Sequence, residues 1–199
     1  MHEPHAETVL DLVHGRRGHF ALESGHHGAL WLDLDPLFTD PRRIRRCIDT
    51  FVAALRPHAV DAVCGPLLGG AFLAQLVAQA LDVEFWFTER KMPAASTGLY
   101  HARYRLPPAL SARAQGRRVA MVDDVMSAGS ALRGTFDEVM SHGAVPVVAG
   151  ALLVLGSTGA GYFAEQGIAV EAVAREAYEL WAPEHCPLCA AGVPLERVN

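Results

Sequence analysis

Apolar and polar positions follow two different periods along the middle of the chain. Short continuous apolar runs predict buried strands, and these lie at residues 60–64, 83–87, 118–122, 145–155 and 168–173. Apolar residues at helical spacing lie between them, at residues 71–81, 130–141 and 158–166. Strands that alternate with helices predict an α/β fold with a central, mostly parallel sheet flanked by helices. In such sheets, ligands bind beyond the carboxyl ends of the strands.

The two ends of the chain are less regular. Residues 1–38 form a His-rich stretch that we interpret as a loose leader. Thr39 or Asp40 can then cap a helix that has Pro41 in its first turn. Residues 89–110 are polar and contain prolines, which predicts a long loop. We expect one domain over residues 1–199, with an N-terminal part (1–38), a core (39–175) and a C-terminal tail (176–199).

Composition narrows the class of protein. The chain has 199 residues, a formal net charge of −5 and 51% hydrophobic residues. A domain of this size can bury a substantial core, so disorder of the whole chain is excluded. The mild acidity argues against a dedicated nucleic-acid-binding protein. Arginines cluster between Arg42 and Arg46, and we interpret them as a solvated helix face. The alternative is a surface that binds phosphate or a partner, including RNA.

The sequence also bears on location and on cysteine chemistry. No apolar run reaches the roughly 18 residues that a membrane span requires. The first residues lack the basic start and apolar stretch of a signal peptide, so we expect a cytoplasmic protein with no membrane partner. The four cysteines are too few for a disulfide framework in a chain of this length.

The most informative segment is 118–133. Apolar residues 119–122 form a strand, and Asp123 and Asp124 stand at its carboxyl end. A loop of small residues, 127–129, then leads into a helix that starts at Ser130. Small residues let an anion approach the unpaired N–H groups at a helix N-terminus, and the two serine hydroxyls add donors.

The acidic pair adds a second kind of recognition. Carboxylates accept hydrogen bonds, so Asp123 and Asp124 can hold the vicinal hydroxyls of a sugar. They can also hold a magnesium ion through water. The alternative is an ordinary strand-to-helix turn in which the carboxylates only cap the helix. The combination of apolar strand, acidic pair, small loop and helix favours a site for a phosphorylated sugar.

This segment resembles the phosphoribosyl-pyrophosphate motif of the type I phosphoribosyltransferases, and its amino-acid sequence is most similar to that of the orotate phosphoribosyltransferase branch. Three further fragments resemble that branch in the same order. They are residues 20–26 in the N-terminal part, 61–70 at the first strand and pyrophosphate loop, and 87–91 at the start of the mobile catalytic loop. The resemblance extends over residues 19–173.

The resemblance implies the type I phosphoribosyltransferase fold with small hood segments from the two termini. It implies transfer of the phosphoribosyl group from phosphoribosyl pyrophosphate to a nucleobase, with Mg²⁺, in a homodimer. Asp123 and Asp124 would hold the ribose hydroxyls, and Arg90 and Lys91 would come from the mobile loop. The remaining donor-site residues are the pyrophosphate loop Leu68, Gly69 and Gly70 and the 5′-phosphate loop Ser127, Ala128, Gly129 and Ser130.

The acceptor side departs from the orotate pattern. The mobile loop has Ala94 and Ser96 where that branch has a lysine and a histidine. The long strand ends at Leu155, and Leu155-Gly156 stands where that branch has an Asp-Arg pair whose arginine faces orotate. Orotate, giving orotidine monophosphate in pyrimidine nucleotide biosynthesis, is the first acceptor to test. The alternatives are a purine or another base, or a regulator that binds phosphoribosyl pyrophosphate without catalysis.

The C-terminal tail carries a separate pattern, His185-Cys186-Pro-Leu-Cys189. A Cys-x-x-Cys pair with an adjacent histidine can supply zinc ligands, although a structural zinc ion normally takes four. His185, Cys186 and Cys189 are therefore candidate zinc ligands. A redox pair and a tight turn with two half-buried thiols are the alternatives.

Overall fold

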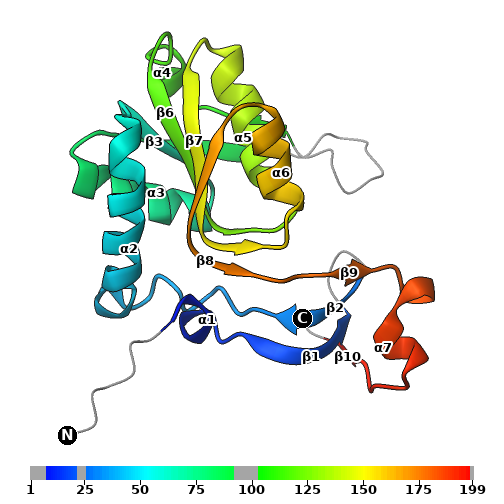
Figure 1. Ribbon diagram of the computed structural model, residues 1–199. Helices are drawn as coiled ribbons and strands as arrows, with labels where there is room; N and C mark the ends of the chain where they lie inside the picture. The colour runs from blue at the N-terminus through cyan, green and yellow to red at the C-terminus, as the bar shows by residue number, and fades with distance from the viewer. Residues whose placement is uncertain (1–7, 22–25, 92–102, 198–199) are drawn as a thin grey trace, which may run out of the picture. The chain divides into compact units, whose positions relative to one another are not determined.

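The computed structural model describes residues 8–21, 26–91 and 103–197, which form two compact units. One unit comprises residues 45–175, here called the sheet unit, and the other comprises residues 1–44 and 176–199, here called the terminal unit. Figure 1 shows the elements of both. Among the described helices, none combines the length and apolar character that crossing a bilayer requires.

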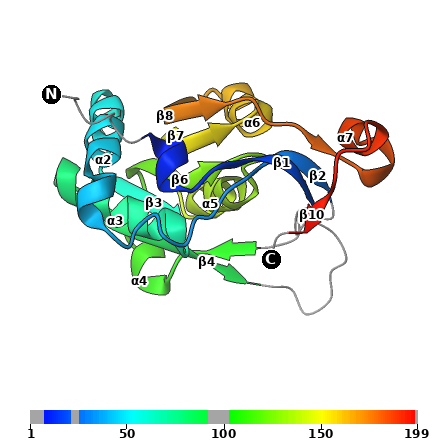
Figure 2. The ribbon, with the colours of Figure 1, turned by 90° about the horizontal axis from the view of Figure 1, so that it is seen from below.

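A six-stranded sheet forms the centre of the sheet unit, in the order β5-β4-β3-β6-β7-β8. Figure 2 shows this order from β8 to β4. The pairs β3–β4, β3–β6 and β6–β7 are parallel, whereas β5 is antiparallel to β4 at one edge. The strands are β3 (Ala62–Pro66), β4 (Glu84–Lys91), β5 (Arg103–Arg105), β6 (Arg118–Met126), β7 (Val145–Leu155) and β8 (Ala169–Glu176). The prediction of a mostly parallel sheet flanked by helices is confirmed.

Helices cover both faces of this sheet (Figure 1). Phe51 of α2 lies over Gly150 of β7, where a Cβ atom would come within 2.8 Å of the Phe51 ring. On the other face, Phe136 of α5 packs edge-to-face on Phe163 of α6. The helices are α2 (Pro41–Leu55), α3 (Gly69–Leu81), α4 (Pro108–Ser111), α5 (Ser130–Ser141) and α6 (Thr158–Glu165), with a 3-10 turn, η1, at Arg56–His58.

The predicted elements of the core are largely confirmed, with two differences. The helix from Ser130 and the strand Val145–Leu155 have the predicted bounds. By contrast, β6 continues past residue 122 to Met126, because its last residues still pair with β7. The stretch 89–110 is not only a loop: β4 continues into it to Lys91, and β5 and α4 also lie there.

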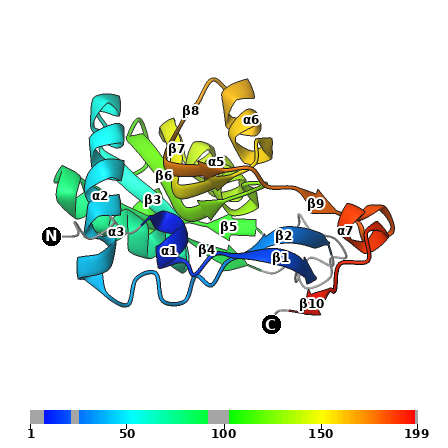
Figure 3. The ribbon, with the colours of Figure 1, turned by 60° about the horizontal axis from the view of Figure 1, so that its bottom comes forward.

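The terminal unit contains a second, four-stranded sheet in the order β10-β1-β2-β9 (Figure 3). β1 and β2 are antiparallel, β2 is antiparallel to β9, and β1 is parallel to β10. Both outer strands are only two residues long. The elements are α1 (Val9–Leu12), β1 (Arg16–Ala21), β2 (His27–Trp31), β9 (Leu180–Trp181), η2 (Pro183–His185), α7 (Pro187–Ala190) and β10 (Glu196–Arg197).

This sheet corrects the interpretation of residues 1–38 as a loose leader. The polar residues Arg16–His19 belong to the strand β1, which pairs with β2 through its backbone groups. A bulge between Arg17 and Phe20 interrupts the register, and it also breaks the alternation by which a strand is recognised in a sequence. Phe20 and Leu30 are nonetheless buried, so the two strands contribute to a core.

Candidate active site

Asp123 and Asp124 lie near the carboxyl end of the central strand β6. Asp123 still pairs with Ala151 of β7, so the sheet fixes the backbone of the acidic pair. The backbone N–H of Asp124 donates to Oδ1 of Asp123 at 3.1 Å, and the N–H of Val125 donates to Oδ1 of Asp124 at 2.7 Å. These local bonds hold both carboxylates in defined positions.

Gly69 and Gly70, here called the glycine turn, follow the neighbouring strand β3 at the start of α3 and pack directly against the two carboxylates. A Cβ atom on Gly69 would overlap Oδ2 of Asp124. A Cβ atom on Gly70 would come within 2.7 Å of Oδ1 of Asp123 and 2.6 Å of the Pro66 ring. Only glycine fits at both places, because the contacts leave no room for a side chain. The structure therefore brings together the acidic pair and the glycine turn, which are more than fifty residues apart in sequence.

The surroundings of the acidic pair raise the pKa values of both carboxyl groups. Burial, and secondarily the neighbouring charge of Asp124, raises the pKa of Asp123 well above its ordinary value. Burial also raises the pKa of Asp124, although the backbone N–H of Val125 opposes that effect. Two carboxylates this close in a partly dry site resist double ionisation. Groups that donate hydrogen bonds to the pair, such as sugar hydroxyls, would favour the ionised form.

The loop after β6 ends at the N-terminus of α5. Gly129 is the N-terminal capping residue, with φ of 74°, a left-handed conformation that favours glycine. No side chain caps the helix there. The first N–H groups of a helix have no partner within it, so they are available to an anion. Nearby, the N–H of Gly159 donates to the carbonyl of Ser127 at 3.0 Å, which joins the loop to the start of α6.

Arg90 and Lys91 are the last residues of β4. Lys91 forms an ion pair with Glu89, with 2.5 Å between Nζ and Oε2. Residues 92–102, including Ala94 and Ser96, lie outside the described part of the chain. Arg90 and Lys91 thus belong to a strand, and the catalytic loop itself stays a prediction.

Tyr104 of β5 is a half-buried residue that the sequence analysis did not single out. It pairs with Arg90 across the β4–β5 ladder. Burial raises its pKa, the charge of Arg90 lowers it and the charge of Asp123 raises it. The Tyr104 ring packs on α5, where a Cβ atom on Gly134 would overlap it. Its only signal in the sequence is an aromatic residue between two arginines, which is not specific.

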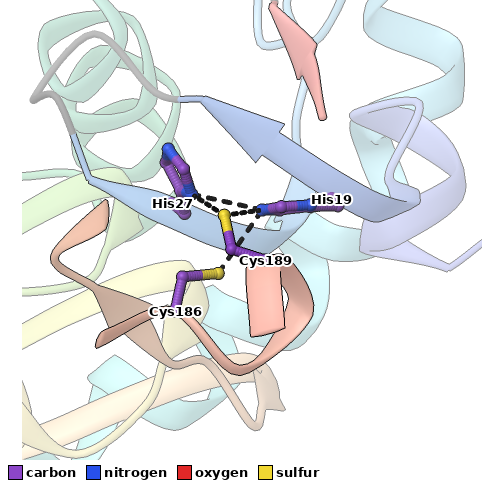
Figure 4. Close-up of side chains that lie close together, drawn as sticks. All are labelled: His19, His27, Cys186 and Cys189. Atoms are coloured by element: carbon purple, nitrogen blue, oxygen red, sulfur yellow. Dashed lines mark hydrogen bonds between the residues drawn. The ribbon is translucent and has the colours of Figure 1, made fainter. Parts of the chain in front are cut away.

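The tail cysteines belong to a different place in the fold. Cys186 and Cys189 lie beside His19 of β1 and His27 of β2, within the terminal unit (Figure 4). His185, the third ligand suggested by the sequence, is not part of this cluster. His19 and His27 were missed because they lie more than 150 residues before the cysteines.

The fold and the site together define a phosphoribosyltransferase. The characteristic pattern of the phosphoribosyl transferase domain matches residues 40–184, most of the chain, which therefore belongs to this family of enzymes. Among its relatives is the orotate phosphoribosyltransferase of Carboxydothermus hydrogenoformans, 33% identical over 182 residues, which cover 90% of this chain and 88% of the relative. The orotate phosphoribosyltransferase of Thermotoga maritima is 28% identical, over 90% of this chain and 89% of its own length.

Solved structures agree on the fold. The crystal structure of orotate phosphoribosyltransferase from Aeropyrum pernix superposes with a TM-score of 0.64 at 22% identity, covering 81% of this chain and 87% of that one. The adenine phosphoribosyltransferase from Thermoanaerobacter pseudethanolicus gives a TM-score of 0.60, also at 22% identity, covering 74% of this chain and 88% of that one. Enzymes that act on different bases therefore share this fold, and the fold alone does not select the acceptor.

Proposed function

We propose that this enzyme transfers the phosphoribosyl group of phosphoribosyl pyrophosphate to orotate, giving orotidine monophosphate and pyrophosphate. The bond between C1 of the ribose and the pyrophosphate oxygen breaks, and its electron pair leaves with pyrophosphate. A ring nitrogen of orotate forms the new bond to C1 and loses its proton to solvent. Such a reaction needs positioning of the two reactants and stabilisation of the charge that develops on the leaving group.

The observation that carries the proposal is the contact between the glycine turn and the acidic pair. Asp123 and Asp124 would accept hydrogen bonds from the two ribose hydroxyls. The backbone of Leu68, Gly69 and Gly70 would face the pyrophosphate, which is attached to the same ribose. The absence of side chains at both glycines lets the donor approach the backbone closely, and Leu68 beside them is exposed.

The 5′-phosphate would bind at the start of α5. The residues that would surround it are Ser127, Ala128, Gly129 and Ser130. Uncapped N–H groups, the partial positive charge of the helix end and the serine hydroxyls suit a phosphate dianion. The acidic pair and this anion site are joined by one short loop, as the two ends of a ribose 5-phosphate require.

Cations complete the donor site. Magnesium would arrive with phosphoribosyl pyrophosphate as part of the substrate and offset the charge of the pyrophosphate. The oxygens of Asp123 and Asp124 fit a hard cation, either directly or through its water molecules. Arg90 and Lys91, at the start of the catalytic loop, would add positive charge near the departing pyrophosphate. A homodimer, in which this loop reaches the neighbouring site, belongs to the same proposal and is checked by the molecular mass in solution.

The choice of orotate as the acceptor rests on the relatives that are orotate phosphoribosyltransferases, because the residues expected to bind orotate differ in this chain. Leu155 is buried at the end of β7 and Gly156 follows with φ of 65°, so neither offers a cation to the orotate carboxylate. A purine acceptor is therefore the alternative that the experiment must separate from orotate.

The test is pyrophosphate release from magnesium phosphoribosyl pyrophosphate, measured in parallel with orotate, uracil, adenine, guanine and hypoxanthine. Asp124→Asn should abolish turnover, whereas Asp49→Asn, on the exposed face of α2, should leave it unchanged. Turnover with orotate alone supports the proposal. Turnover with a purine alone overturns the acceptor. Donor binding by calorimetry without turnover on any base would overturn the enzymatic role in favour of a regulator.

A further inference from the structure

Four potential metal ligands converge in the terminal unit, whereas the acidic pair and the glycine turn belong to the sheet unit. His19 comes from β1 and His27 from β2, whereas Cys186 is the residue before α7 and Cys189 lies within it (Figure 4). One ligand atom from each, either an imidazole nitrogen or a thiol sulfur, lies within 4.8 Å of all the others. Three separate segments thus supply two nitrogen and two sulfur atoms to one point.

The distances match those around a tetrahedral zinc ion. With ordinary zinc bond lengths, two nitrogen ligands are about 3.3 Å apart, and a nitrogen and a sulfur ligand about 3.6 Å. Nε2 of His19 lies 3.2 Å from Nδ1 of His27. The sulfur of Cys189 lies 3.3 Å from Nδ1 of His27 and 3.7 Å from Nε2 of His19, and the sulfur of Cys186 lies 3.4 Å from Nε2 of His19. Small side-chain adjustments are enough to close a tetrahedron.

The other ring nitrogen of His19 supports the same interpretation. Nδ1 of His19 lies 2.8 Å from the carbonyl oxygen of Val193, so this nitrogen carries the proton and donates it. Nε2 is then unprotonated, and its lone pair faces the cluster. Histidines that bind metals are typically oriented by such a bond from the second nitrogen to a carbonyl group. The carbonyl group of Val193 thus fixes both the tautomer of His19 and the direction in which its Nε2 points.

Hydrogen bonds alone account less well for the cluster. Nδ1 of His27 would have to donate to Nε2 of His19, and the thiol of Cys186 would then have to donate to that same nitrogen, which already accepts a bond. His19, His27 and Cys186 are all buried, where neutral imidazoles and thiols gain little from weak sulfur hydrogen bonds. A metal ion satisfies all four groups at once.

We propose that His19, His27, Cys186 and Cys189 bind one zinc ion in a structural site. Two imidazoles and two thiolates in a tetrahedron suit zinc, and four protein ligands leave no open position for substrate. Zinc replaces the two thiol protons, which are released to solvent, and no oxidant is involved. The proposal of a zinc site does not depend on the proposed transferase activity.

The site would hold together the two ends of the chain. Cys186 and His19 are 167 residues apart in sequence. The outer strands β9 and β10 form two residue pairs each with β2 and β1, and an exposed ion pair between Arg16 and Glu196 adds to the second attachment. Units smaller than about 70–80 residues commonly need a metal or a disulfide to supplement a small core. Zinc would therefore fasten residues 180–197 onto the β1–β2 hairpin.

The experiment measures metal in the full-length chain, purified without a tag or chelator. Mass spectrometry of the metal content should give one zinc per chain. His27→Gln and Cys189→Ala should each reduce the zinc content at least tenfold. His185→Gln, next to Cys186 but outside the cluster, and Cys64→Ala, a buried thiol of β3, should retain one zinc per chain.

Cobalt replacement keeps the test valid if a variant fails to fold. Wild-type protein stripped with a chelator and reconstituted with Co²⁺ should show the intense visible bands of a tetrahedral ion and the thiolate charge-transfer band. Reduced wild-type protein that takes up neither zinc nor cobalt would overturn the proposal. So would a Cys186–Cys189 disulfide in freshly purified protein, detected as a mass two hydrogens lower, which would indicate a redox pair.

Discussion

Gly69 lies so close to Asp124 that even a methyl group on Gly69 would overlap the Asp124 carboxylate. The carboxylate cannot easily turn away, because its Oδ1 accepts a hydrogen bond from the N–H of Val125 at 2.7 Å. The glycine turn and the acidic pair are thus in close contact at the place where we propose that phosphoribosyl pyrophosphate binds. A change at either partner should disturb the other.

Gly69→Ala should therefore reduce activity strongly while leaving the fold intact. The added methyl group must displace Asp124 or the turn, and a misplacement of about 1 Å in a positioned site can cost 10²-fold in rate. We expect kcat/KM to fall by about that factor and the melting temperature to fall as well, because packed groups must move to relieve the overlap with Asp124. Gly161→Ala in α6, where a Cβ atom meets nothing within 4 Å, is the matched control and should keep full activity. Equal activity of the two variants would contradict the assignment of the glycine turn.

The acidic pair should make the folded enzyme less stable as pH rises. Burial and the charge of Asp124 hold the pKa of Asp123 above its ordinary value, so the folded state keeps a proton that the unfolded state has released. Wherever the folded state binds more protons, the free energy of unfolding decreases with increasing pH. This loss begins near the unfolded pKa of about 3.9 and is complete above the raised folded pKa.

Asp123→Asn removes this titration. The variant should lose catalysis and gain stability relative to wild type, and the gain should increase as pH rises from about 4. Urea unfolding of both proteins at a series of pH values measures the difference directly. Asp49→Asn, on the exposed side of α2, should show no such trend. A stability difference between Asp123→Asn and wild type that stays constant with pH would refute the raised pKa.

The core was predictable because its pattern is local. The strand Val145–Leu155 is a continuous apolar run, and the helix from Ser130 begins after a loop of small residues, so each carries its own boundaries in the sequence. The end of β6 was placed too early, because Asp123 and Asp124 are polar and only the pairing with β7 shows that the strand continues. The short strand β5, which is arginine-rich, has no apolar signal at all.

The candidate sites divide in the same way. The acidic pair and the phosphate loop lie within one short segment, so the sequence alone identified them as candidates. The contact of Gly69 with Asp124 depends on two neighbouring strands and required the fold. His19 and His27 have no characteristic spacing with Cys186, and only the pairing of the two chain ends brings them together.

A buried pair of hydroxyl groups joins β4 to α5 in the sheet unit. Oγ1 of Thr88 lies 2.8 Å from Oγ1 of Thr135, and both residues are fully buried. Thr135→Val keeps the shape and removes one hydroxyl, which leaves the other without this bond. We expect a loss of about 1–3 kcal/mol in the free energy of unfolding.

The double variant separates this bond from a packing effect. Thr88→Val with Thr135→Val replaces both partners by groups of the same shape, which can be nearly neutral. Chemical denaturation of the wild type, the two single variants and the double variant gives the coupling free energy. Additive losses in the double variant would show that the two hydroxyls do not act as a pair.

Removal of zinc should loosen the terminal unit and spare the sheet unit. Without the metal, β9 keeps two residue pairs with β2, and β10 keeps two residue pairs with β1 and the Arg16–Glu196 ion pair, so residues 180–197 should exchange their amide hydrogens faster. The β6–β7 pair, which is buried and long, should exchange at an unchanged rate. Excess zinc at about 1,000 times its dissociation constant should restore about 4 kcal/mol to the terminal unit. Hydrogen exchange with and without chelator measures both regions in one experiment, with Cys189→Ala as the zinc-free reference. Equal protection of residues 180–197 in both conditions would mean that the metal, even if bound, does not hold the tail in place.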